Sequence, residues 1–477
     1  MDTKKLRQKI LDLAIHGKLV PQDPNDEPAS VLLEHIKVEK ERLIKEGKIK
    51  KSKKSAKTSD TPHYPYLLPK GWEWCKLEDI AYVASGSTPS KESFVSDGIP
   101  YIKMYNLRNQ KIDFDFKPQY IKPEVHNGKL QRSRTEVGDL IMNIVGPPLG
   151  KLAIIPSSLP QANFNQAAVL IRPLLHKAIL TKYLFYYLSE MSEIKSIATK
   201  GSAGQVNISL TQSQNMRIPL PPLSEQNRII VEIEYYFDLI STIEQSQSDL
   251  QVTIKQTKRK ILDLAIHGKL VSQDPNDEPA SELLKCINPK AEITCDNGHY
   301  ENLPDSWCLT DIKSIFTINP KNKVADDVIA GFVPMINIAD DYSNEFRFES
   351  KLWGDIKKGF THFADGDIVV AKISPCLENR KSVIVTSLPN GIGAGTTELF
   401  VFRSQYILPE YGLYFFKSDS FINNCAGTFN GVVGQQRVSK SIIENIKFPL
   451  PPISEQRRIV DAVHKVFAKL DAIMENL

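Results

Sequence analysis

The stretch KILDLAIHGKLVPQDPNDEPASVLL, residues 9–33, returns as KILDLAIHGKLVSQDPNDEPASELL at residues 260–284, with only two positions changed. Each copy begins as an apolar helical pattern, ends that pattern at a glycine (Gly17 or Gly268) and continues into a Pro-rich acidic turn. Because internal repeats report repeated structural units, the same local structure is expected to form twice in the chain.

A second repeat lies between the copies of the first. PLPPLSEQ (219–226) aligns with PLPPISEQ (449–456) at an offset of 230, and IPYIKM (99–104) aligns more loosely with VPMINI (333–338) at an offset of 234. The order is therefore short segment, module, long segment, module, short segment. The connecting segments are near-copies while the modules differ, so we expect the connectors to contact like partners and the modules different ones. A recent duplication without functional meaning would instead predict equal divergence everywhere.

The long connecting segment is predicted to be a helix. Between residues 229 and 264, seam positions recur in alternating steps of four and three, and only Gln247 and Thr257 among them are polar. This spacing is typical of a coiled coil, with an ordinary amphipathic helix as the alternative. Ser224 is expected to cap the helix and Gly268 to end it. About 43 residues at ~1.5 Å each give a rod of roughly 65 Å.

The two chain ends repeat the two halves of this helix. Residues 459–477 keep the rhythm of its first half, residues 6–17 keep that of its second half, and only residues 248–251 lack a counterpart. We therefore predict a pseudo-circular, pseudo-two-fold protein. In it, one continuous rod and one rod split between the termini pack antiparallel, with a module at each end.

The predicted fold class is α+β, with two mixed α/β domains separated by two long antiparallel coiled-coil rods. Expected strands such as Ile99–Met104 and Val333–Ile338 alternate with expected helices such as Thr181–Ile197 and Pro409–Asn424. In chain order we expect an N-terminal helical segment (1–34), a basic linker (35–66), the first module (67–222), a central helical segment (223–285), a linker (286–302), the second module (303–452) and a C-terminal helical segment (453–477).

Charge is balanced over the 477 residues, with 60 Lys and Arg against 56 Asp and Glu. A uniformly basic nucleic-acid binder is thereby excluded, but local basic patches are not. Residues 37–57 hold ten Lys or Arg against three Glu; a solvated, partly disordered linker is the favoured reading and a phosphate clamp the alternative. No apolar run is long enough to span a membrane and the N-terminus lacks a cleavage signal, so a cytoplasmic location is expected.

Catalytic and metal-binding signatures are missing from the sequence. There is no P-loop, no [DN]-P-P-[FY], no G-x-S-x-G and no H-E-x-x-H. The group Cys286, Cys295, His299 and Cys308 fits no zinc spacing. We therefore expect no catalytic residue, no metal site and no cofactor site in this chain.

Two duplicated pairs of residues are expected to be structural. His16 and His267 stand near the ends of the predicted helices, where a helix C-terminus favours a cation, so a capping role is expected rather than a catalytic one. Trp72 and Trp307 occupy equivalent positions and are expected in the cores.

Taken together, ILDLAIHGK with its DPNDEPAS turn, PLPPLSEQNRI, LPKGW, SGSTPS, IPYIKM and GDLI resemble the specificity subunit of type I restriction–modification systems, over essentially the whole chain. The resemblance implies two target recognition domains, each reading one half of a split, asymmetric site in double-stranded DNA. It also implies helical regions that dock two copies of a DNA methylation subunit, with two restriction (motor/nuclease) subunits able to join. The subunit itself is then non-catalytic, and S-adenosylmethionine, ATP and Mg belong to the partner subunits.

Two other classes of function stay open at this point. One is an enzyme in its own right, against which the missing motifs argue. The other is a non-catalytic coiled-coil scaffold that pairs two proteins without sequence-specific DNA reading. The duplicated DPNDEP strings (23–28 and 274–279) fit either a simple Pro-rich turn or part of a partner-docking face, and the sequence does not separate the two.

Candidate DNA contacts are loop residues whose side chains suit base edges, with Arg and Lys for guanine, and Asn and Gln for adenine. The strings GSAGQVNIS (201–209) and GVVGQQRVS (431–439) align at an offset of 230, so Asn207 and Arg437 occupy equivalent positions with different chemistry. The candidates in the first module are Lys91, Arg108, Asn109, Gln110, Lys151, Ser202, Gln205 and Asn207. Those in the second are Lys321, Asn322, Lys323, Lys372, Asn379, Arg380, Lys381, Asn430, Gln435, Gln436 and Arg437.

Overall fold

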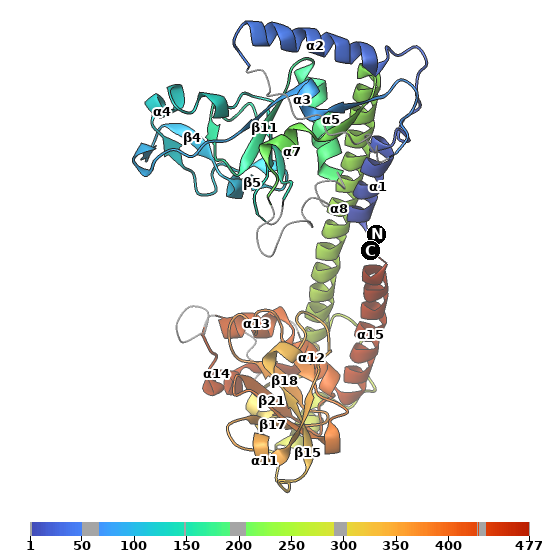
Figure 1. The fold of residues 1–477 in the computed structure, drawn as a ribbon. Coiled ribbons are helices and arrows are strands. Elements are labelled where there is room, and N and C mark those ends of the chain that lie inside the picture. The colour runs from blue at the N-terminus through green and yellow to red at the C-terminus, as the bar shows by residue number, and fades with distance from the viewer. Residues whose placement is uncertain are drawn as a thin grey trace. The chain divides into compact units, whose positions relative to one another are not determined.

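The chain divides into two compact units, Met1–Gln245 and Ser246–Leu477. The computed structural model describes residues 2–49, 66–146, 149–190, 207–290, 303–426, 428 and 436–476 (Figure 1). The division falls within the long helix α8 (Leu223–Ile266), so the predicted central helical segment contributes to both units.

Unit 1 combines helices with short strands. Its helices are α1 (Thr3–Ile15), α2 (Ala29–Lys45), α3 (Leu77–Ile80), α4 (Pro123–Asn127), α5 (Lys177–Glu190), α7 (Leu210–Gln214) and the first part of α8. Its strands are β1 (Glu73–Lys76), β2 (Ala81–Ser85), β3 (Phe94–Val95), β4 (Ile99–Ile102), β5 (Leu107–Arg108), β6 (Lys111–Ile112), β7 (Tyr120–Ile121), β8 (Leu140–Asn143), β9 (Leu152–Ile154), β10 (Asn163–Phe164), β11 (Ala168–Pro173) and β12 (Arg217–Leu220).

Unit 2 repeats this composition. Besides the second part of α8, its helices are α9 (Ala280–Ile287), α10 (Ile312–Ile315), α11 (Trp353–Ile356), α12 (Pro409–Phe416), α13 (Asp419–Ala426), α14 (Lys440–Asn445) and α15 (Ile453–Glu475). Its strands are β13 (Cys308–Asp311), β14 (Thr317–Ile318), β15 (Ile329–Val333), β16 (Glu349–Leu352), β17 (Thr361–Ala364), β18 (Ile368–Ala371), β19 (Ser382–Ile384), β20 (Ile392–Gly395), β21 (Leu399–Arg403) and β22 (Lys447–Leu450).

The two modules share the strand order of their first sheet but differ in the second, where the parallel partner β10 is an edge strand in module one and its counterpart β20 is an inner strand in module two. Module one has sheets ordered β2-β11-β8-β9 and β10-β4-β7-β3, and module two has sheets ordered β14-β21-β18-β19 and β16-β15-β20-β17. The central strands β8 and β18 are buried at every residue and are apolar except for Asn143. A separate antiparallel pair, β1 with β12 or β13 with β22, joins the start of each module to its end. The predicted α+β class with two domains and helical connectors is confirmed.

Within each unit the connecting helices run antiparallel. In unit 1, Arg7 of α1 binds Glu244 of α8 at 3.0 Å, whereas Asp26, further along the chain, binds Arg228 near the start of α8 at 2.6 Å. Unit 2 repeats the arrangement: Lys258 in the second part of α8 binds Asp471 near the end of α15 at 2.5 Å, and Asp277, after α8, binds Arg458 near the start of α15 at 2.6 Å. The predicted antiparallel pairing is therefore present inside each unit.

The heptad seam of α8 is buried near both ends of the helix. Ile229, Ile233 and Ile240 are at most 2% exposed, whereas Ile243 and Leu250 are 38% and 37% exposed. Ile254 and Ile261 are 4% and 8% exposed, so the seam is covered on both sides of Ile243 and Leu250, while Tyr236, also a seam position, is 36% exposed.

Several boundaries differ from the sequence prediction. The expected helix Pro409–Asn424 is two helices, α12 and α13, because the Ser418 hydroxyl donates to Phe415 O and ends the first one. The expected cap Ser224 lies inside α8, which begins directly after the two prolines. Helix α2 continues to Lys45, so the first part of the predicted basic linker is helical, while residues 50–65 lie outside the described part of the chain. Of the expected helix Thr181–Ile197, residues 191–197 also lie outside it.

The register between IPYIKM and VPMINI is also corrected. The expected strand Val333–Ile338 ends at Val333 and continues as one turn of 3-10 helix, Met335–Asn337, equivalent to Met104–Asn106 in module one. In both modules the asparagine carbonyl accepts a backbone N–H from the next strand or turn, at 2.8 Å for Asn106 and 3.0 Å for Asn337. The equivalent strings are therefore MYNL and MINI, at an offset of 231 rather than 234. At the offset of 234 the two strings share only a proline and an isoleucine, which is too little to fix the register.

Candidate nucleic-acid interface

The two sequence repeats meet at a buried junction in unit 1. The indole Nε1 of Trp72 donates to Glu225 Oε2 at 3.0 Å, and Gln22 Nε2 donates to Glu225 Oε1 at 3.1 Å. Gln22 also donates to Gly17 O at 2.7 Å, which ties the turn after α1 to the start of α8. Burial raises the pKa of the Glu225 carboxyl, because the charged form loses solvation.

Unit 2 contains the same junction. Trp307 Nε1 donates to Glu455 Oε2 at 2.9 Å, and Gln273 donates to Glu455 Oε1 at 2.6 Å and to Gly268 O at 3.3 Å. Burial again raises the pKa of the Glu455 carboxyl. Both tryptophans are buried, as expected from the sequence.

Glycine is required at the helix ends that form these junctions. Gly17 has φ +63°, and a Cβ there would lie 2.4 Å from Pro69 Cγ; Gly268 has φ +66° and the same closeness to Pro304 Cγ. The predicted glycine stops are confirmed. His16 closes α1 through Nδ1, 2.7 Å from Asp12 O, and so serves the capping role expected from the sequence.

The DPNDEP turns are partly internal. Asp26 is paired in a two-point contact with Arg228, at 3.2 and 2.6 Å, and the Asp277–Arg458 contact in unit 2 has the same distances. The carboxylates of both aspartates are 8% exposed. This part of each turn holds the fold together.

The rest of each turn faces outward with the same residues in both units. We call these two surfaces the linker patches; their members are Asp23, Pro24, Asn25 and Glu27 in unit 1, and Asp274, Pro275, Asn276 and Glu278 in unit 2. All eight residues are exposed. Two identical acidic patches are thus presented, one by each unit.

Asn207 and Arg437 lie at equivalent positions beside the central strands. Asn207 forms an isolated β-bridge with Val145, directly after β8, and Arg437 forms the same bridge with Ile373, directly after β18. Both residues are exposed. The structure thus confirms the alignment of the two loops, and it places different side chains at one shared point of the two modules.

Arg437 is oriented by a carboxylate that sequence analysis missed. Its Nε and Nη2 donate to the two oxygens of Glu398 at 2.8 and 2.9 Å, and the pKa of the Glu398 carboxyl is lowered by this guanidinium. The equivalent residue in module one is Ala167, since Ile144 N donates to Ala167 O as Lys372 N donates to Glu398 O. Glu398 is 39 residues from Arg437 in sequence, so no local motif could have revealed the pair.

The other module-one candidates lie on different surface features. Lys91 is exposed on a single turn of 3-10 helix, whereas Arg108, Asn109 and Gln110 belong to the exposed hairpin of β5 and β6. Lys151 is half-buried and its backbone N–H donates to Asn143 Oδ1. Ser202 and Gln205 lie outside the described residues.

Several module-two candidates make contacts inside the module. Asn322 Nδ2 donates to Phe363 O at 2.7 Å, Lys381 Nζ donates to Ile338 O at 2.6 Å, and Arg380 pairs with Asp419. The Arg380 and Lys381 side chains are each 16% exposed.

The remaining module-two candidates are more varied. Lys321, Lys323 and Asn379 are exposed, while Lys372 lies with Nζ 5.6 Å from the centre of the Phe400 ring. Gln436 is half-buried and its carbonyl accepts from Ser374 N at 2.9 Å. Asn430 and Gln435 lie outside the described residues.

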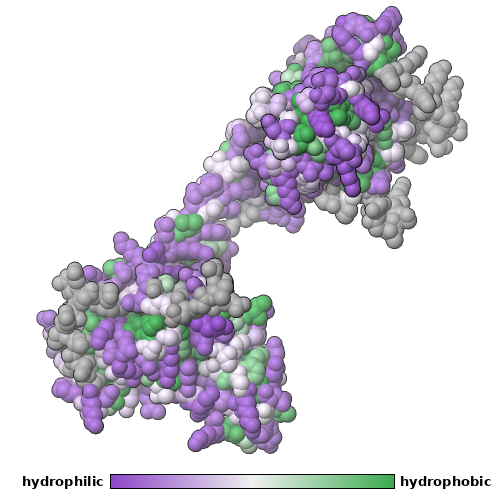
Figure 2. Space-filling model, turned by 90° about the vertical axis from the view of Figure 1, so that its left-hand side faces the viewer, coloured by the Kyte–Doolittle hydropathy of each residue, from purple (hydrophilic) through white to green (hydrophobic). Residues whose placement is uncertain are grey.

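Within the part of the chain that the structure describes, no group of three or more His, Cys, Asp or Glu side chains is arranged to hold a metal ion. Cys295 and His299 fall outside that part, while burial raises the pKa of the Cys308 thiol to about 11. No described helix is long and apolar enough to cross a membrane. Hydrophilic side chains cover much of the face seen in Figure 2.

Residues 69–252 and 304–477 each match the family model described as the type I restriction modification DNA specificity domain. These two matches include most of the chain and one module each. The chain therefore belongs to this family.

Curated relatives bear the corresponding names. The chain is 46% identical over 226 residues to the type I restriction enzyme EcoAI specificity subunit and 43% identical over 239 residues to the EcoEI specificity subunit, both of Escherichia coli. These matches cover 43% and 46% of this chain, and only 38% and 40% of the two relatives. The EcoKI specificity subunit of Escherichia coli K12 is 22% identical over 418 residues, covering 85% of this chain and 84% of the relative.

Solved structures share the fold. A chain from a structure concerned with complex assembly and conformational transition of the type I R-M system superposes with a TM-score of 0.57 at 16% identity, covering 86% of this chain and 94% of that one. The HsdS subunit from Thermoanaerobacter tengcongensis gives 0.50 at 17% identity, covering 86% and 93%. At these identities the likeness concerns the fold alone.

Proposed function

We propose that this chain is the DNA sequence-specificity subunit of a type I restriction–modification enzyme and performs no bond chemistry itself. Each module would read one half of a bipartite, asymmetric site in double-stranded DNA. One observation carries the proposal: the two units repeat the same junction, Trp72–Glu225 and Trp307–Glu455, yet present different exposed side chains, Asn207 and Arg437, at one shared point. A protein that recognises two different half-sites needs the same structural junction in both modules and different base-contacting side chains on each.

The linker patches are the proposed docking surfaces for two copies of the methylation subunit, with two restriction subunits able to join. Because the patches are identical and exposed, they can receive two identical partners in the same way. S-adenosylmethionine for adenine N6 methylation, and ATP and Mg for restriction, are assigned to those partners. We propose the cytoplasm as the location, because the DNA and the partner subunits are found there.

All the candidate DNA contacts are proposals, and we rank them by how exposed their side chains are. The exposed residues are favoured because a side chain must reach a base edge or a phosphate. These favoured residues are Lys91, Arg108, Asn109, Gln110, Asn207, Lys321, Lys323, Asn379 and Arg437. Asn322, Arg380 and Lys381 rank last, since their polar groups already serve contacts within module two.

The decisive experiment is a base-resolution map of N6-methyladenine in the native cell, with and without this gene. The expected result is that deletion removes methylation at one split motif, which would reveal the half-sites and the spacer together. An unchanged map in cells that express the chain and its methylation partner would overturn the proposal. Binding of S-adenosylmethionine by the isolated chain would instead favour an enzyme.

A further inference from the structure

A two-stranded hairpin projects from module one at residues 107–112. Strands β5 and β6 pair Leu107 with Ile112 and Arg108 with Lys111, leaving only Asn109 and Gln110 in the turn. Both turn residues are exposed and have left-handed backbones, with φ of 48° and 59°. This is the geometry of a tight type I′ turn.

Gln110 is not the residue that the turn itself prefers. Type I′ turns favour Asn followed by Gly, because glycine adopts positive φ without a steric penalty and glutamine does not. Asn109 fits the first position well. The turn therefore carries an exposed glutamine side chain at a position where the backbone would favour glycine.

The base of the hairpin is a fixed cluster of cations and an aromatic ring. The Arg108 guanidinium lies 4.1 Å from the centre of the Phe116 ring and Lys117 Nζ lies 5.4 Å from it. Tyr105 packs edge-on against the same ring at 6.2 Å. Arg108 also pairs with Asp113 at 3.6 Å. The cluster holds the base in place and leaves the tip exposed.

The equivalent loop of module two is longer and is tied down. With Asn106 matched to Asn337, the hairpin corresponds to the loop between Ile338 and Phe346, which are themselves bridged. Lys255 of α8 binds the Asp341 carboxylate at 2.8 Å, and the buried Lys417 Nζ donates to Asp341 O at 2.8 Å. The loop therefore braces module two against its own helices.

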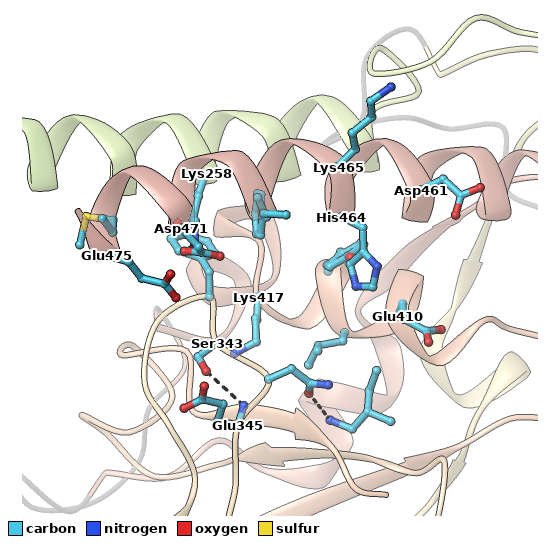
Figure 3. Close-up of a pocket in the computed structure, with 18 residues that line it drawn as sticks. Lys258, Ser343, Glu345, Glu410, Lys417, Asp461, His464, Lys465, Asp471 and Glu475 are labelled. Carbon is cyan, nitrogen blue, oxygen red and sulfur yellow. Dashed lines mark hydrogen bonds and ion pairs between the residues drawn. The ribbon is translucent and has the colours of Figure 1, made fainter. Parts of the chain in front are cut away.

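The same loop forms one wall of a pocket of about 1000 Å³ within unit 2, opposite α15 (Figure 3). Tyr342 packs against Phe467 of α15 with ring centres 6.0 Å apart. Carboxylates and amines are interleaved around the pocket, among them Glu345, Asp471 and Lys258. A surface of mixed charge built around a tethered loop does not favour a polyanion.

We infer that the hairpin 107–112 enters a DNA groove and is a specificity-determining element of module one, whereas the loop 339–345 of module two is a brace and not a reader. A two-stranded ribbon fits the major groove, where the amides of Asn109 and Gln110 suit adenine and Lys111 suits a phosphate. The inference rests on the proposed function and assigns different reading elements to the two modules.

The test uses the full chain assembled with its methylation subunit, with Gln110→Gly as the main variant and N6-methyladenine mapping as the readout. Glycine relieves the backbone, so the thermal midpoint is expected to be unchanged or higher, while one base position in one half-site becomes permissive. Ser387→Gly is the matched control, because Ser387 is exposed at φ 56° in module two. It should leave the whole motif unchanged.

Asn109→Ala provides a second variant, should the glycine alter the hairpin. If both hairpin variants retain the wild-type motif while the protein methylates normally, the reading role is overturned. If the wild-type complex methylates no split motif at all, the proposed function fails instead. Tyr342→Ala should lower the thermal midpoint without altering either half-site. A changed half-site would contradict the purely structural role of the loop 339–345.

Discussion

The indole nitrogen of Trp72 lies 3.0 Å from a carboxylate oxygen of Glu225, although 153 residues separate the two. Trp72 stands just before the first strand of module one, and Glu225 is in the first turn of α8, so the contact joins the entry of the module to its exit. Trp307 and Glu455 repeat the contact at 2.9 Å. Each module is thus attached to its helices by the same buried bond.

Trp72→Phe should destabilise unit 1. Phenylalanine keeps most of the packing but leaves a buried carboxylate oxygen without its donor, which typically costs about 1–3 kcal/mol. Hydrogen exchange followed by mass spectrometry should show faster exchange in peptides around residues 66–80 and 217–230. Trp307→Phe is the matched control and should act on unit 2 peptides. Equal exchange in the variant and the wild type would show that the bond contributes nothing.

The Asp26–Arg228 pair should show strong coupling. Its two-point geometry and an aspartate carboxylate only 8% exposed distinguish it from ordinary surface pairs. A double-mutant cycle with Asp26→Ala and Arg228→Ala, read by chemical denaturation, should give a coupling of about 1–3 kcal/mol. The exposed pair Lys5–Asp2 provides the comparison and should give a clearly smaller coupling, because solvent screens it. Additive effects at Asp26 and Arg228 would contradict this view.

Charge reversal on the linker patches should block assembly without harming the fold. Glu27→Lys with Glu278→Lys changes one exposed carboxylate in each unit. Mass photometry with the methylation subunit should show loss of both partners for the double variant and one partner bound for each single variant. The thermal midpoint should stay within about a degree or two, because exposed changes are usually nearly neutral. Full assembly of the double variant would place docking elsewhere.

Lys417 should make the stability of unit 2 depend on pH. Burial lowers the pKa of its amine to about 7, from an ordinary value of 10.5. Between these values the unfolded chain binds one proton more, so the free energy of unfolding rises with pH by up to about 1.4 kcal/mol per unit. Below pH 7 this slope disappears. Lys417→Met lacks the group, so denaturation of the wild type and the variant from pH 6 to 9 should give diverging curves. Parallel curves would exclude this effect.

Arg437→Asn should change one base preference in the half-site read by module two. The substitution gives module two the residue found at the equivalent point of module one, and asparagine suits adenine where arginine suits guanine. Glu398→Ala should act in the same half-site but more weakly, by loosening the arginine. Methylation mapping reads out both variants, with Lys440→Ala as an exposed control. A change confined to the other half-site would reverse the assignment of modules.

Repeats with strong local signals predicted the architecture well. The glycine stops, the apolar seam around Ile233 and the equivalence of Asn207 with Arg437 all depend on spacing along the chain, which the sequence displays directly. The register of VPMINI was wrong by three residues because Ile102 ends a strand, whereas Ile336 is 85% exposed after one. Three-dimensional hydrogen bonding, and not residue type, decides that equivalence.

Long-range partners were the part that the sequence could not supply. Arg380 and Lys381 were predicted to be loop cations available to DNA. In the structure Arg380 pairs with Asp419 of α13 and Lys381 donates to Ile338 O in the turn after β15, and neither partner is close in sequence. Glu398 was missed for the same reason. The sequence left open whether DPNDEP is a simple turn or part of a docking face. For Asp26, the ion pair with Arg228 favours the structural role.

The pairing of chain segments about 200 residues apart has a consequence for synthesis on the ribosome. Asp26 is 202 residues ahead of Arg228, so at about 5–20 residues per second α1 waits on the order of 10–40 s for its partner helix. During that interval Ile10, Leu11 and Ala14, all buried in the finished unit, have no α8 to cover them. The second part of α8 waits about as long for its own partner helix α15, because Lys258 is 213 residues ahead of Asp471. These two helical segments, α1 and the second part of α8, are therefore where a nascent chain of this protein is most exposed to chaperones and proteases.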